Sequence, residues 1–438
     1  MPHLTILGGG PSGLAVGYYA RKCNFPFTIY EASDRVGGNC ITIKHGEFLF
    51  DSGAHRLHDK FEDITKEIRR LLGDDLQKID APSQIYHEGK FIDFPLSPFN
   101  LLRNLGLYNC WKAGADLIYT RLKKRSDDHS FENFAIHTYG RNLAQRFLLD
   151  YSQKLWGLPC RNLSPAISGS RMKGLDLKTF LIEAIFGRQR KSEHLDGSFY
   201  YPRMGYGEIS EALANFCEGQ NIHRRCRVTK IRHDLDRIKT IEVNGSETVE
   251  VDLLINTLPI NLFISIMDPA VPAEMEILAK SLRFRNVVLV ALFIDRAGIT
   301  ANASIYFPDA NYPFTRVYEP RNRSRWMAPS GKTSLVAEIP CNGEDELWKG
   351  DPARLQQLVI GPLREIFHLA EPEILDSRVV RIPNAYPVLE IGCEEKSEQL
   401  FRYLGRFKNL HLSGRSGLFA YTHLHDLMKL GKDLVEAI

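Results

Sequence analysis

The segment HLTILGGGPSGLAVGYYARK, residues 3–22, decides the fold of this 438-residue chain. It opens with an apolar run, His3 to Leu7, whose length is typical of a buried strand. Glycines follow at G-x-G-x-x-G spacing, at positions 8, 10 and 13, and Leu14 to Lys22 has the pattern of a helix. A second apolar run, Pro26 to Tyr30, ends in Glu31, eighteen residues after the last glycine. The predicted order is strand, glycine turn, helix, strand and acid.

Each glycine of this turn meets a physical requirement of nucleotide binding. Gly8 permits the tight turn, Gly10 lets the backbone approach a pyrophosphate, and Gly13 lets the helix pack closely on the strand. The helix N-terminus, which includes Pro11 and Ser12, faces the phosphates with a partial positive charge. Glu31 is placed to accept hydrogen bonds from a ribose diol. The whole pattern favours a dinucleotide site over a glycine-rich loop without a ligand.

Composition and charge exclude several other classes of protein. The hydrophobic content of 44% and the charged content of 25% are ordinary for a soluble globular protein, and the length predicts two or three lobes. A net charge of +3, spread along the chain, gives no reason to expect a nucleic-acid partner. No apolar run approaches the ~20 residues that span a bilayer. The N-terminus shows no leader, and eight cysteines without CxxC spacing indicate reduced thiols, so we expect a cytoplasmic protein.

The remaining sequence predicts a discontinuous organisation. Residues 100–187 are mainly helical in pattern, and residues 262–384 are rich in strands. The strand before Asn256 to Pro259 is expected to return the chain to the nucleotide-binding sheet. We therefore predict a nucleotide-binding domain from residues 1–80, 196–260 and 385–438, a mainly helical lobe from 81–195, and an antiparallel-sheet substrate domain from 261–384.

One stretch of the helical lobe can be read in two ways. The basic tract RLKKR, residues 121–125, together with Leu101, Leu102, Leu105, Trp111 and Leu117, can lie on a membrane surface. The favoured interpretation is a helix that packs on its own domain and leaves its basic end in solvent. We therefore expect a small-molecule substrate rather than a membrane or nucleic acid as partner.

The stretch GAHRLHD, residues 53–59, raises a separate question about chemistry. His55 and His58 are three residues apart, but Arg56 between them would repel a metal cation, and no third ligand lies at usable spacing, so we predict no metal. The two remaining interpretations are a loop that faces a bound group and a surface turn that closes a strand.

The residues after Glu31 point to one cofactor. The extension EASDRVGGN, residues 31–39, resembles flavoproteins of the amine oxidase, protoporphyrinogen oxidase and UDP-galactopyranose mutase superfamily. The resemblance implies FAD and places the 53–58 loop against the flavin ring, where Arg56 would stabilise negative charge on the reduced ring. The cofactor-binding residues that we expect are Gly8, Gly10, Pro11, Ser12, Gly13, Glu31, Ala32, Arg35, Gly37, Gly38, Asn39, Gly53, Val228, Gly414, Arg415 and Leu424.

The resemblance continues along the chain in order. DYSQKLWGLP (150–159), YPRMGYGEISEAL (201–213) and GRSGLFAYTHLHDL (414–427) are similar to segments of the same flavoproteins that border substrate and flavin. We expect the catalytic residues to be His55, Arg56, Tyr421 and His423. The substrate-binding residues that we expect are Tyr151, Trp156, Arg171, Arg203 and Tyr206.

The fold class that we predict is α/β, a discontinuous Rossmann-like FAD-binding domain with a helical lobe and an antiparallel β-sheet substrate domain.

The resemblance implies two possible activities. The primary hypothesis is an FAD-dependent oxidoreductase that dehydrogenates an organic substrate by hydride transfer to flavin N5. The alternative is a flavin-dependent UDP-sugar mutase, which would hold a diphosphate between two arginines; Arg171 matches the first, and the second falls imprecisely near Lys280 to Arg285. His423 stands where the mutases have an aspartate.

Overall fold

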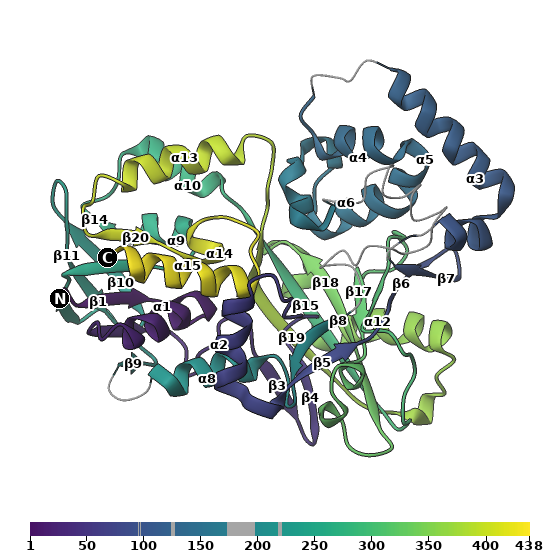
Figure 1. Cartoon of the computed structure of the whole chain (residues 1–438), viewed down its shortest axis with the longest axis horizontal. Helices are drawn as coiled ribbons and strands as arrows, with labels where there is room; N and C mark the ends of the chain where they lie inside the picture. Colours follow the sequence, from purple (N-terminus) through teal and green to yellow (C-terminus); the bar gives the residue numbers. More distant parts are fainter. Residues whose placement is uncertain (95, 97, 124–127, 173–197, 218–220) are drawn as a thin grey trace.

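The computed structural model of the chain describes residues 1–94, 96, 98–123, 128–172, 198–217 and 221–438. Among these residues the strands form a five-stranded, a four-stranded and a seven-stranded sheet, together with two short pairs. The result is the mixed α/β architecture that the sequence predicts (Figure 1). No helix within the described residues has the length and apolar character to cross a bilayer.

The five-stranded sheet is parallel and carries the glycine turn. Its order is β20 (Leu410–Leu412), β13 (Leu253–Asn256), β1 (Leu4–Leu7), β2 (Phe27–Tyr30) and β9 (Ile222–His223). The expectation that the segment ending at Asn256 rejoins this sheet is confirmed, because β13 pairs with β1 in register. Strands from three distant parts of the chain thus end at one edge, where parallel sheets bind ligands.

Helices and a small sheet cover the two faces of the parallel sheet. On one side lie α1 (Pro11–Lys22), α2 (Glu62–Leu72), α8 (Gly207–Cys217) and α15 (Leu424–Ala437), packed through a continuous apolar core. On the other side lie α9 (Ile260–Ser265), α10 (Ala273–Ser281), α13 (Cys393–Leu404) and the sheet β12 (Glu247–Glu250), β11 (Ile238–Val243), β10 (Val228–His233) and β14 (Met267–Asp268). The strands β1 and β2 of the parallel sheet are buried almost throughout, as their unbroken apolar runs predict.

The seven-stranded sheet is mostly antiparallel. Its order is β19 (Ile374–Pro387), β15 (Phe284–Ile294), β18 (Thr333–Cys341), β17 (Arg316–Tyr318), β16 (Ser304–Tyr306), β6 (Ser83–His87) and β7 (Lys90–Phe94). Alternate residues of β15 face α12 (Pro352–Phe367) on one side and the hairpin β3 (Thr42–His45) and β4 (Phe48–Asp51) on the other. The short helix α11 (Glu346–Lys349) follows β18, and the pair β5 (Leu76–Asp80) and β8 (Ser198–Pro202) lies beside the sheet.

The helical lobe stands apart from the parallel sheet (Figure 1). It contains α3 (Pro98–Leu122), α4 (Phe131–Tyr139), α5 (Arg141–Ala144), the π-helical turn Gln145–Leu149, α6 (Asp150–Trp156) and the 3-10 turns Cys160–Asn162 and Pro165–Met172. Our division assigned residues 81–195 to this lobe, whereas β6 and β7 pair within the seven-stranded sheet. Residues 83–94 join the seven-stranded sheet because β6 pairs in parallel with β16 and β7 pairs with β6. The boundaries of the three predicted domains stay a prediction.

Candidate functional site

The glycine turn forms a close-packed corner between β1 and α1. Gly8 has φ +99°, and a Cβ at Gly13 would lie 1.9 Å from the carbonyl oxygen of Gly8. Any larger residue at position 13 would therefore separate the helix from the strand. A Cβ at Gly10 would meet only the Cα of Gly38, at 3.9 Å, so the space in front of Gly10 is open. No side chain caps the first turn of α1, whose amide groups face this space.

Glu31 lies against the same turn. It follows β2, and its carboxylate accepts hydrogen bonds from the amide of Gly9 at 2.7 Å and from the amide of Ser33 at 2.8 Å. The next loop is tied to the turn by the amide of Gly37, which donates to the carbonyl of Gly9 at 2.8 Å. Arg35 donates to the carbonyl of Gly38 at 3.1 Å, so a cation stands beside the corner.

A third segment completes this cradle from the C-terminal part of the chain. Gly414, which begins α14 (Gly414–Gly417) after β20, has φ +86°, and a Cβ there would lie 3.0 Å from the Cβ of Ser12. The hydroxyls of Ser12 and Ser413 are 3.0 Å apart. Three glycine turns thus converge on one uncapped helix N-terminus, and this arrangement fits the pyrophosphate of a dinucleotide.

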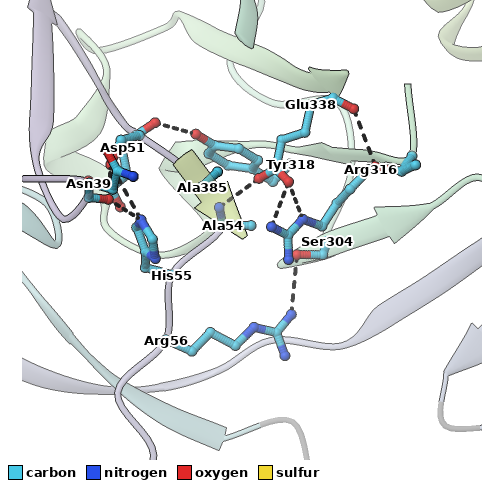
Figure 2. A network of polar contacts seen from close by, with 12 residues as sticks. Asn39, Asp51, Ala54, His55, Arg56, Ser304, Arg316, Tyr318, Glu338 and Ala385 are labelled. Atoms are coloured by element: carbon cyan, nitrogen blue, oxygen red, sulfur yellow. Dashed lines mark hydrogen bonds and ion pairs between the residues drawn. The ribbon is translucent and has the colours of Figure 1, made fainter. Parts of the chain in front are cut away.

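The 53–58 loop crosses from this cradle to the seven-stranded sheet, and its two central side chains diverge (Figure 2). The ring of His55 points to the backbone of the 31–39 loop, where Nε2 donates to the carbonyl of Asn39 at 3.1 Å. The guanidinium of Arg56 points to the sheet and donates to the hydroxyls of Ser83 at 2.8 Å and Ser304 at 3.3 Å. The ring of His55 therefore lies on the side of the loop where the flavin is predicted. The guanidinium of Arg56 instead fixes the loop to β6 and β16.

Burial and positive neighbours keep His55 neutral. Burial, followed by the charges of Arg415, Arg316 and Arg323, lowers the pKa of His55 to about 3. Since Asn39 offers a carbonyl, the hydrogen of the neutral ring sits on Nε2. The ring also stacks on Tyr206, with centroids 5.0 Å apart. His55 can therefore accept or pass a hydrogen bond at neutral pH, but it does not carry a charge.

A buried ion pair lies beside this loop and was missed by the sequence interpretation. Nε and Nη2 of Arg316 on β17 donate to one carboxylate oxygen of Glu338 on β18, at 2.9 and 2.6 Å, and the other oxygen accepts from the amide of Ala54 at 2.8 Å (Figure 2). The two residues are register partners. A signal existed in the sequence for Glu338, because it stands inside the apolar strand TSLVAEIPC and a charge buried in this way needs a partner.

Aromatic side chains line the region around Arg316. Tyr151 of α6 lies near Arg316 on the side of the helical lobe, and Tyr386 lies near it at the end of β19. Trp156 and Tyr421 pack on Tyr386 and so extend this aromatic region. The rings of Trp156, Tyr386 and Tyr421 have centroids 5.9 to 6.0 Å apart. Burial raises the pKa of Tyr386 to about 12 and raises that of Tyr151 further, so both hydroxyls stay protonated.

Arg415 connects this aromatic region to the nucleotide cradle. It lies directly after Gly414, stacks on the ring of Tyr421 with its guanidinium carbon 5.2 Å from the centroid, and donates to the carbonyl of Ala385 at 3.1 Å. His423 caps α15 with its backbone amide, which donates to Asp426 at 3.0 Å, and its ring is 5.4 Å from that of Tyr421. The C-terminal candidates therefore gather where cradle and aromatic region meet.

Other predicted residues lie elsewhere. The guanidinium of Arg203 stacks on Trp326 at 3.9 Å, near Asp75, at a partly exposed position. Tyr206 is buried beneath His55, and Leu424 is buried in the core around α1. The remaining candidates Ala32, Gly53 and Val228 lie after β2, after β4 and at the start of β10. The side chain of Arg171 lies outside the described residues, so its assignment stays a prediction.

The stretch expected to supply a second diphosphate-binding arginine is occupied by other contacts. Lys280 pairs with Glu276, and Arg283 pairs with Glu390, both at the surface. Arg285 is buried and donates to the carbonyls of Lys154, Leu155 and Pro340 at 3.2 to 3.3 Å. The cations that lie among the aromatic residues are instead Arg316 and Arg415.

The fold and the cradle define a dinucleotide-binding flavoprotein with a separate substrate sheet. The model of the family described as flavin containing amine oxidoreductase matches residues 11–419, and the chain belongs to this family. It is an FAD-dependent oxidoreductase, and the predictions of fold, cofactor and enzyme class are confirmed.

Curated relatives agree with this assignment. Coproporphyrinogen III oxidase of Bacillus subtilis is 22% identical over 464 residues, covering 99% of this chain and 97% of that protein. Protoporphyrinogen oxidase 1 of Arabidopsis thaliana chloroplasts is 29% identical over 155 residues, 33% of this chain and 28% of that protein.

Two solved structures share the whole fold. Reduced UDP-galactopyranose mutase matches with a TM-score of 0.86 at 19% identity, over 100% of this chain and 93% of the other. A putative protoporphyrinogen oxidase from Exiguobacterium matches with a TM-score of 0.79 at 18% identity, over 100% and 98%.

Proposed function

We propose that this oxidoreductase dehydrogenates a reduced, flat organic ring that carries acidic groups, a substrate of the porphyrinogen type. The observation that carries the proposal is the largely buried Arg316, held by Glu338 near aromatic side chains and beside the 53–58 loop. Aromatic faces suit a planar ring, and a guanidinium suits a carboxylate. The full-length similarity to coproporphyrinogen III oxidase supports the same substrate class.

The residues around the site have separable roles in this proposal. FAD, when bound, takes up the hydride equivalent from the substrate. The cradle at Gly10 and Glu31 would hold its pyrophosphate and ribose. Neutral His55 would hydrogen-bond near the ring without adding charge, and Arg415 would favour negative charge there. Arg316 would orient the acidic group of the substrate, and Trp156 and Tyr421 would exclude water from it.

The test is an anaerobic titration of the yellow holoenzyme with coproporphyrinogen III, followed by admission of air. We expect the visible absorption of the oxidised flavin to bleach with substrate and to return with air. Arg316→Met should raise the substrate concentration for half-maximal bleaching by roughly tenfold or more, the loss of one charge-assisted hydrogen bond. A flavin that stays oxidised in the presence of excess substrate would overturn the proposal.

A second candidate is a flavin-dependent UDP-sugar mutase. The specific observation in its favour is again Arg316: its Nε and Nη2 bind Glu338, and its Nη1 has no hydrogen-bond partner among the described residues, so this nitrogen can bind a phosphate oxygen. UDP added to dithionite-reduced protein distinguishes the two candidates. A flavin spectrum that shifts with UDP, combined with no bleaching by porphyrinogen, would make the mutase the better account.

A further inference from the structure

The outer face of α3 exposes a continuous apolar surface. The helix is interrupted at Gly106, which has φ +79°, and continues through Leu122. Its exposed large apolar side chains are Leu107, Tyr108, Trp111, Ile118, Tyr119 and Leu122. At about 100° per residue these positions fall within an arc of roughly 120° on one side of the helix. Trp111 is 71% exposed and Leu122 is 81% exposed, so this face is not packed on the protein.

The opposite face of α3 holds the helix to its lobe. Ala113 is buried there, and the carboxylate of Asp116 accepts a hydrogen bond from the amide of Asn142 at 2.8 Å, at the start of α5. Asp116 is the only acid between residues 107 and 123. The helix therefore packs on its own lobe and leaves its basic end in solvent, which is the interpretation favoured from sequence, but it does so through Ala113 and Asp116 and leaves Trp111 exposed.

The charges that border the exposed face are all positive. Lys112, Arg121 and Lys123 are exposed, and the ammonium of Lys123 lies 4.5 Å from the ring centroid of Tyr119. The sequence continues the basic tract with Lys124 and Arg125. The face thus joins tryptophan, tyrosine and leucine side chains to a rim of cations with no acid between residues 117 and 126, a combination that suits the boundary of an anionic lipid bilayer.

We propose that α3 is a membrane-docking helix that lies in the plane of an anionic bilayer surface. Its apolar face enters the region between headgroups and acyl chains, and Lys112, Arg121 and Lys123 contact the lipid phosphates. Figure 1 places α3 at the outer edge of the helical lobe, away from the parallel sheet, so docking leaves the nucleotide cradle uncovered. The proposal is independent of the identity of the substrate.

The experiment is co-sedimentation of the holoenzyme with vesicles of phosphatidylcholine containing about 30 mol % phosphatidylglycerol. We expect the wild-type protein to bind, and the double variant Trp111→Glu, Leu122→Glu to bind at least tenfold more weakly with unchanged FAD content. The matched control is Leu235→Glu, Ile277→Glu, which adds the same charges at exposed apolar positions in the layer that covers the parallel sheet and should bind as wild type.

The basic rim is tested separately. Lys112→Gln and Lys123→Gln should each weaken binding to the anionic vesicles about fivefold and have little effect with phosphatidylcholine alone. Equal sedimentation of the wild-type protein, the α3 variant and the control would overturn the proposal. The proposal would also be overturned if the wild type did not bind vesicles but formed a dimer that the Trp111→Glu, Leu122→Glu variant lost. That result would assign this face to a second copy of the chain.

Discussion

At the scale of single residues, two glycines of the same turn have different physical functions. Gly13 is required by the protein itself, because a Cβ there would overlap the carbonyl oxygen of Gly8. The packing of the protein does not require Gly10, since a Cβ at this position would project into open space at the N-terminus of α1. We therefore predict that glycine at position 10 serves a ligand that approaches the backbone and not the packing of the protein.

This difference predicts separate outcomes for two matched substitutions. Gly10→Ala should fold with the stability of the FAD-free wild type but bind FAD at least tenfold more weakly, because its methyl group occupies the pyrophosphate space. Gly13→Ala should instead lower the stability of the FAD-free protein by a few kcal/mol, on the order of an overpacked core. Thermal unfolding without FAD and a titration with FAD measure the two effects. Normal FAD affinity of Gly10→Ala would contradict the assignment of the cradle.

At the scale of elements, a buried arginine of the seven-stranded sheet positions the helix α6. The helix ends at Gly157, which has φ +71°, and the guanidinium of Arg285 from β15 donates to the carbonyls of Lys154 and Leu155 in the last turn. A Cβ at Gly157 would lie 2.5 Å from the guanidinium carbon. Because Trp156 precedes this glycine, the contact fixes an aromatic side chain of the candidate substrate site.

Gly157→Ala should therefore destabilise the protein more than an alanine at an equivalent backbone conformation. Gly89, with φ +76° and no atom within 4 Å of its virtual Cβ, is the matched control. Both changes carry the left-handed backbone cost of about 1 kcal/mol, and only Gly157→Ala displaces Arg285, which should add about 1–3 kcal/mol. The midpoints of urea unfolding measure this difference. Equal midpoints would show that α6 does not depend on the contact.

At the scale of the whole molecule, buried polar residues join the nucleotide cradle to the substrate sheet. Asp51 at the end of β4 accepts from the amide of Tyr206 at 2.9 Å, and its carbonyl accepts from the hydroxyl of Tyr318 at 2.7 Å. Arg323, fully buried, donates to the carbonyl of His55 at 2.9 Å. The candidate site lies at this junction. The protonation of its buried side chains is therefore linked to the free energy of unfolding of the whole protein.

The lowered pKa of His55 predicts one such linkage. Its ordinary value is near 6.5, and its value in the folded protein is about 3, so in this interval the unfolded chain binds a proton that the folded protein does not. Stability should fall as the pH drops from about 6.5 toward 3, by at most about 1.4 kcal/mol per pH unit from this group. Thermal unfolding of the wild type and of His55→Gln between pH 6 and pH 4 measures the contribution of His55 to this loss of stability. A wild-type slope no steeper than that of the variant would contradict the linkage.

The sequence by itself determined the features that depend on local spacing. The glycine turn, the helix after it and Glu31 lie within 31 residues, so their order predicted the parallel sheet, the cradle and FAD. The tertiary structure decided what depends on the register of distant strands. Arg316 meets Glu338 only because β17 pairs with β18, and β6 enters the seven-stranded sheet only beside β16. Periodicity located an amphipathic helix at α3, but packing alone decided which of its faces is exposed, because burial depends on the neighbours that the fold supplies.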